Sequence, residues 1–108
     1  MKNEAKYHKY IEVFKKSFPN KEITDKSYNV TLVRYLLMYF LYLEKRTNKS
    51  IKYDDIAKIF GCDSSSVCVA VKKVKQYNSI EKIKLLGNKK ELFRYFYTKF
   101  NRIFHSKQ

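Results

Sequence analysis

Apolar side chains recur every three or four residues along most of this chain, and this spacing is typical of one face of an α-helix. The first segment with this pattern is Asn3–Phe18, and Pro19 ends it. In the second segment, Ser27–Arg46, the stretch Val30–Leu43 is apolar almost all round. A helix of that kind is usually central, because neighbours cover several of its sides. The pattern therefore predicts an N-terminal amphipathic helix and a central apolar one.

The remainder of the chain repeats the helical spacing in shorter segments. Helices are expected over the segments Tyr53–Phe60, Ser64–Tyr77, Ile80–Leu86 and Lys90–Phe104. The chain holds two Gly and one Pro, too few for the many turns of an all-β domain. We predict an all-α fold of five to six helices around the central apolar helix, in a single domain that spans residues 1–108.

The charge of the chain narrows the range of partners. The formal net charge is +14, and only Glu81 and Glu91 oppose the lysines and arginines from Ser64 to the end. Such a surface attracts polyanions, of which DNA, RNA and an acidic membrane surface are the obvious examples. The alternative is that the excess of lysine only keeps the protein soluble.

The sequence gives little reason to expect a membrane protein or a metalloprotein. The longest apolar run, Tyr35–Leu43, is far shorter than the roughly 20 residues that span a bilayer. Cys62 and Cys68 have no nearby His, so they do not form a zinc-binding pattern. Their spacing allows a disulfide, which would strain the helix start, and reduced thiols are the better expectation. We expect no cofactor, no membrane partner and a cytoplasmic, nucleoid-associated protein.

A helix-turn-helix is expected at about residues 53–77. This motif needs a small residue in its first helix, a Gly in its turn and a β-branched apolar residue in its second helix. Ala57, Gly61 and Val67 occupy those places in order. The alternative is an ordinary helical hairpin with a coincidental Gly.

The second helix of such a motif reads base edges with its N-terminal residues. Short hydroxyls there can hydrogen-bond bases or phosphates, although they can also simply cap the helix. Lysines further along are expected to contact the phosphate backbone. The candidates for base contact are Asp63, Ser64, Ser65, Ser66 and Val69, with Cys68 beside them, and those for phosphate contact are Lys72 and Lys73.

Several motifs occur in the order of a known family. They are Arg34, Met38-Tyr39, Thr47-Asn48, Ile56 with Phe60-Gly61, Asp63-Ser64-Ser65-Ser66-Val67 and Lys72-Lys73-Val74. Over Lys26–Val74 the chain thereby resembles the C-terminal DNA-binding domain of the replication initiator DnaA, part of the Trp-repressor-like helix-turn-helix group. Cys62 stands where that family has Arg, and Ser64 where it has His.

The resemblance implies roles for the matching positions. Arg34 would insert into the minor groove, Lys26 and Ser27 would hold phosphates from a basic loop, and the residues from Asp63 would read the major groove. The plain alternative for Arg34 is an ion pair with an acid. The chain has no phosphate-binding loop of the ATPase type. We therefore expect a stand-alone relative without the ATPase domain, as from a phage or other mobile element.

The last predicted helix combines aromatic and basic residues. Its aromatic stripe is most simply a core face, and the alternatives are a seam for a homodimer or protein partner, a platform for single strands, or a membrane surface. His8 and His105 have no catalytic partner at a telling spacing, so we expect no enzyme.

These observations together predict sequence-specific double-stranded DNA binding in replication initiation or transcription regulation. The alternative function is a protein-interaction module that binds an acidic protein partner. The predicted DNA-binding residues are Lys26, Ser27, Arg34, Asp63, Ser64, Ser65, Ser66, Val69, Lys72 and Lys73.

Overall fold

Five α-helices make up the fold in a computed structural model that describes residues 4–47, 51–79, 87 and 89–105. They are α1 (Glu4–Ser17), α2 (Tyr28–Thr47), α3 (Tyr53–Ile59), α4 (Ser64–Tyr77) and α5 (Lys90–His105). Each bound lies within one residue of the predicted one, and no strand occurs in the described ranges. The all-α prediction is therefore confirmed. The helix expected over Ile80–Leu86 falls outside the described residues.

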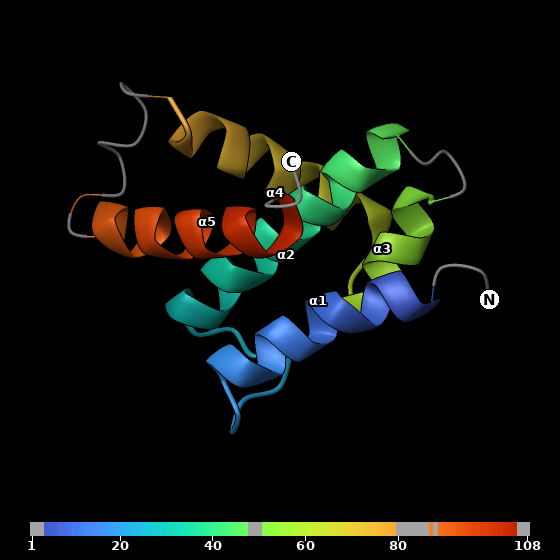
Figure 1. The fold of residues 1–108 in the computed structure, drawn as a ribbon, viewed down its shortest axis with the longest axis horizontal. Helices are drawn as coiled ribbons and strands as arrows, with labels where there is room; N and C mark the ends of the chain where they lie inside the picture. Colours follow the sequence, from blue (N-terminus) through green and yellow to red (C-terminus); the bar gives the residue numbers. More distant parts are fainter. Residues whose placement is uncertain (1–3, 48–50, 80–86, 88, 106–108) are drawn as a thin grey trace.

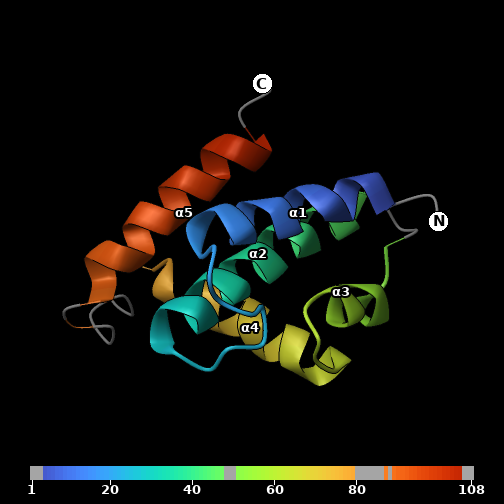
Figure 2. The ribbon, with the colours of Figure 1, turned by 90° about the horizontal axis from the view of Figure 1, so that it is seen from below.

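Helix α2 lies at the centre of the molecule, as its apolar pattern predicts. Figures 1 and 2 show α1 and α5 on one side of α2, with α3 and α4 on the other. All four of these helices contact α2. The side chains of Val30, Val33, Leu36, Leu37, Phe40 and Leu41 are completely buried. Among the described helices, none combines the length and the apolar character needed to cross a membrane.

The aromatic stripe of α5 packs into the core. Phe93, Phe96, Phe100 and Phe104 are all buried. The ring of Phe104 stacks on that of Tyr10 from α1, with 4.2 Å between centroids. Fully burying a side chain of this size stabilises a fold by roughly 1.5–3 kcal/mol. The core explanation of the stripe is therefore correct, and only the opposite face of α5 remains for a partner.

A polar contact joins α1 to α2 beside this stack. The Nζ atom of Lys9 lies 3.1 Å from Oε1 of Glu44. Burial raises the pKa of the neighbouring Tyr10 hydroxyl, and the negative charge of Glu44 raises it further. Tyr10 therefore stays protonated at neutral pH and contributes a neutral ring to the core.

Candidate nucleic-acid interface

Helices α3 and α4 are joined by a tight turn that needs a glycine. The Cys62 amide donates to the Ala57 carbonyl at 2.9 Å, which closes the end of α3. Gly61 has a φ of +65°, a left-handed conformation that L side chains rarely adopt. A Cβ atom on Gly61 would also lie 2.8 Å from Cγ2 of Thr24. The turn is thus packed against the loop between α1 and α2.

Helix α4 divides into an apolar inner face and a basic outer face. Val67, Ala70, Val71 and Val74 are buried where α4 contacts α2 and α3. The outer face carries no acidic residue, and its Val69 side chain is 46% exposed. The exposed residues that define this α4 outer face are Ser65, Cys68, Val69, Lys72, Lys73, Lys75 and Gln76.

The start of α4 is capped by Asp63. Its Oδ1 atom accepts from the Ser66 amide at 2.9 Å, the Ser66 hydroxyl at 2.8 Å and the Ser65 hydroxyl at 2.9 Å. These bonds, led by the one from the Ser66 amide, hold the pKa of Asp63 below its usual value. Asp63 is therefore the residue that caps α4, and Ser64 is half-buried beside it. The hydroxyl protons of Ser65 and Ser66 already have an acceptor, so only the oxygen lone pairs of these serines remain for further hydrogen bonds.

The guanidinium of Arg34 makes its hydrogen bonds within the protein. Its Nη1 atom donates to the carbonyl of Ile23 at 2.7 Å and to that of Asp25 at 3.0 Å. Its Nη2 atom lies 3.4 Å from Oγ1 of Thr31. These contacts turn the half-buried guanidinium into the α1–α2 loop. These bonds hold the loop in place, and insertion of Arg34 into the minor groove stays a prediction.

The α1–α2 loop carries two further predicted residues and contacts the turn through Thr24. Lys26 and Ser27 are exposed, and they follow Thr24, which lies against Gly61. The Ser27 amide donates to Oδ1 of Asp25 at 2.7 Å, and this bond is the largest cause that lowers the pKa of Asp25. Two segments far apart in the sequence therefore meet beside the start of α4.

Two stacked tyrosines flank α4 and were missed by sequence reasoning. The rings of Tyr42 and Tyr53 lie 6.1 Å apart at an interplanar angle of 9°. Lys75 places its Nζ 5.2 Å from the Tyr42 centroid, and Lys45 places its own 4.8 Å from that of Tyr53. The four residues come from α2, α3 and α4, so no local spacing in the sequence reveals them. Lys75 thus lies over this stack at the edge of the α4 outer face.

The cysteines and other potential ligands form no metal centre in the described part of the chain. No group of three or more His, Cys, Asp or Glu is suitably placed there. Cys62 and Cys68 are both free thiols, the first half-buried and the second exposed on α4. Burial raises the pKa of the Cys62 thiol, although the nearby Arg34 charge opposes this.

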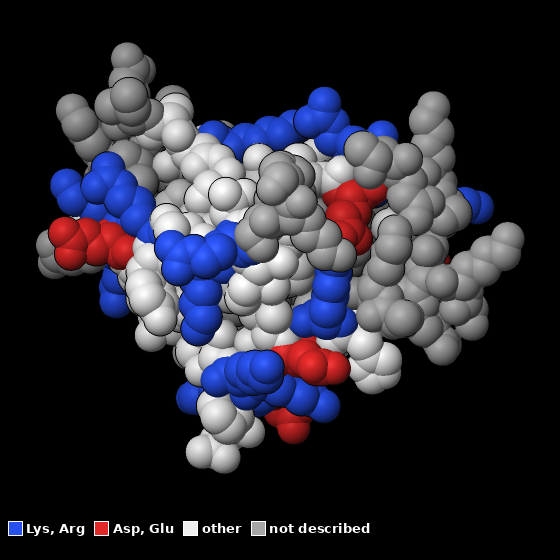
Figure 3. Space-filling view, in the orientation of Figure 1, with Lys and Arg blue, Asp and Glu red and all other residues white. Residues whose placement is uncertain are grey.

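Basic charge also occurs away from α4. Figure 3 shows lysine and arginine side chains spread over the face on which α1 and α5 lie, with a few acidic groups between them. The α4 outer face is therefore distinguished by its freedom from acids and its exposed apolar residue rather than by charge alone. No protein-family model, curated protein or solved structure matches this chain.

Proposed function

We propose that this protein binds double-stranded DNA by placing α4 in the major groove, with α3 and the turn as the supporting half of a helix-turn-helix. The observation that carries the proposal is the α4 outer face, which is exposed, basic and free of acids while the opposite face anchors the helix in the core. The helix has 14 residues, or about 21 Å of length. The major groove of B-DNA admits a helix of this width.

The contacts expected from α4 follow from its side chains. Lys72 and Lys73 would bind phosphates, and no ion pair joins them to an acid among the described residues. The exposed Val69 suits the methyl group of thymine. Because Ser65 and Ser66 donate to Asp63, their oxygens would accept from the amino groups of cytosine or adenine. This arrangement supports base reading at the start of the helix and phosphate contact along it.

The α1–α2 loop would extend this surface. Lys26 and Ser27 follow Thr24, which lies against Gly61, and they would hold the DNA backbone from this loop. The motif order from Arg34 to Val74 supports a relationship to the DnaA C-terminal domain. On that basis we propose a role in replication initiation or transcription regulation at the nucleoid.

Fluorescence-anisotropy titrations at two salt concentrations test this function. The probes are a duplex of random sequence and a duplex that carries the DnaA recognition box. Contact with 6–10 phosphates gives a log–log salt slope of roughly −5 to −9. Preference for the box supports the initiator-like role, and equal binding to both duplexes directs the search to another site. No binding to either duplex at low salt contradicts the proposal.

A matched pair of lysine variants locates the surface. Lys73→Ala should weaken binding to all sequences alike and reduce the size of the salt slope by about 1. Lys16→Ala removes the same charge from an exposed position on α1, on the other side of α2. Lys16→Ala should therefore lose less affinity for duplex DNA than Lys73→Ala does. Equal losses from the two variants would mean that only the net charge matters.

A further inference from the structure

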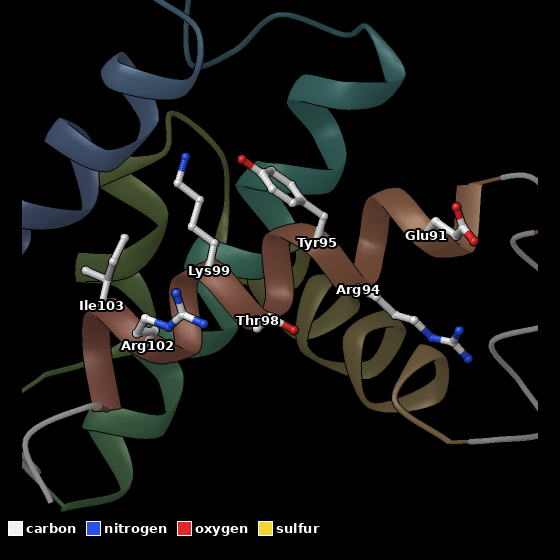
Figure 4. Close-up of a pocket in the computed structure, with 7 residues that line it drawn as sticks. All are labelled: Glu91, Arg94, Tyr95, Thr98, Lys99, Arg102 and Ile103. Carbon is white, nitrogen blue, oxygen red and sulfur yellow. The ribbon is translucent and has the colours of Figure 1, made fainter.

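The outer face of α5 is an exposed, partly apolar surface that DNA binding by α4 does not use. Tyr95 is 58% exposed and Ile103 is 45% exposed, whereas the phenylalanines on the opposite side of α5 are buried. Both residues line a shallow groove along the helix together with Arg94, Lys99 and Arg102 (Figure 4). We call these five residues the α5 outer face.

Charge and apolar groups alternate on this surface. Figure 4 shows Tyr95 and Lys99 extending from the same side of α5. The Nζ atom of Lys99 lies 5.7 Å from the Tyr95 centroid, so the cation rests over the ring. Tyr95 and Ile103 are eight residues apart, or about 12 Å along the helix axis. The acid that shares the groove is Glu91, at the N-terminal end of the helix.

We propose that the α5 outer face binds an acidic amphipathic segment of another protein. Apolar side chains of that segment would cover Tyr95 and Ile103, and its carboxylates would face Arg94, Lys99 and Arg102. Charge complementarity selects this occupant. A second copy of the chain would bring cations against cations, whereas an acidic amphipathic segment supplies both carboxylates for the cations and apolar groups for Tyr95 and Ile103.

This surface and the α4 outer face lie on different sides of the molecule. Helices α4 and α5 both pack on α2, and Figure 2 shows them diverging from the point where Tyr77 at the end of α4 contacts Phe93 near the start of α5. A protein partner on α5 therefore leaves α4 accessible. The proposal goes beyond DNA binding and does not depend on it.

Anisotropy titration with a fluorescein-labelled synthetic peptide tests the proposal. The probe is an 18-residue helical peptide with leucines along one face and glutamates beside them, and its control has glutamine at every glutamate. The glutamate peptide should bind the wild-type protein and the glutamine peptide should not. Ile103→Glu and Arg102→Glu should each weaken binding by roughly tenfold or more, because like charges then meet across the interface.

Val69→Glu is the matched control, because Val69 is 46% exposed and also β-branched, but lies on α4. It should bind the glutamate peptide as the wild type does, and circular dichroism melts confirm that each variant is folded. The proposal would be overturned if the glutamate and glutamine peptides bound equally well. It would also be overturned if Val69→Glu, but neither α5 variant, lost affinity for the glutamate peptide. The proposal would also be overturned if the wild-type protein bound a thymidine oligomer or anionic vesicles instead of the glutamate peptide, and Ile103→Glu abolished that binding. A wild-type dimer in sedimentation equilibrium that Ile103→Glu disrupts would also contradict the proposal, because a second copy of the chain would then occupy the surface.

Discussion

Replacing Gly61 with alanine should reveal how tightly the turn is held against the α1–α2 loop. A left-handed backbone costs an L residue about 1–2 kcal/mol. The added methyl group would also lie 2.8 Å from Cγ2 of Thr24, and overpacking of this kind typically costs about 1–3 kcal/mol. The lower entropy of the unfolded alanine chain offsets roughly 0.4–1 kcal/mol. We expect Gly61→Ala to lower the free energy of unfolding by roughly 1–4.6 kcal/mol.

The chain supplies an internal control at Gly87. Its φ of +55° is also left-handed, but nothing lies within 4 Å of the Cβ that alanine would add. Gly87→Ala should therefore lower the free energy of unfolding only by the cost of holding alanine in a left-handed backbone conformation. The difference between the two variants measures the contact with Thr24, and Thr24→Ser removes the opposing methyl group. Adding Thr24→Ser to Gly61→Ala should recover most of that difference.

Urea unfolding, followed by far-ultraviolet circular dichroism, measures the free energy of unfolding of four variants. They are Gly61→Ala, Gly87→Ala, Thr24→Ser and the double variant Gly61→Ala/Thr24→Ser. Equal destabilisation by the two alanine variants would refute the packing of the loop against the turn. So would a double variant that is no more stable than Gly61→Ala alone.

Three other predictions concern the cap, the exposed thiol and the arginine. Because the pKa of Asp63 is lowered from 3.8, the cap stabilises the protein above that pH, and this contribution is lost as the pH falls through the folded pKa. Asp63→Asn should flatten the dependence of the urea midpoint on pH below 5, and an unchanged curve would contradict the cap. Bound duplex DNA should slow alkylation of Cys68, which is exposed on α4, and equal rates with and without DNA would contradict groove entry. Arg34→Ala should lower the free energy of unfolding by roughly 1.5–3 kcal/mol, since a charged donor is removed from two carbonyls. Altered sequence preference at unchanged stability would instead favour minor-groove insertion.

Helix positions were predictable because their signals are local. Apolar spacing and breakers such as Pro19 and Gly61 act within a few residues, and all five described helices follow them. The buried face of α4 follows from the same spacing. The single domain expected over residues 1–108 and the binding role itself stay predictions.

The contacts between distant segments were not predictable from these signals. Arg34 reaches the carbonyls of Ile23 and Asp25 only because the chain reverses between α1 and α2. The pair of tyrosines beside α4 likewise depends on three helices meeting. Both Asp63 and Ser64 can cap a helix, and three donors converging on one carboxylate oxygen distinguish them only in the folded structure.

The most direct test of the central claim compares Val69→Glu with Ile103→Glu in duplex DNA binding. The two side chains are 46% and 45% exposed, so the substitutions match in introduced charge and in exposure, and the main difference is whether α4 or α5 carries them. If α4 enters the major groove, Val69→Glu places a carboxylate among phosphates and lowers affinity by roughly tenfold or more, while Ile103→Glu loses much less. Equal losses from the two variants, or a larger loss from Ile103→Glu, would contradict the account.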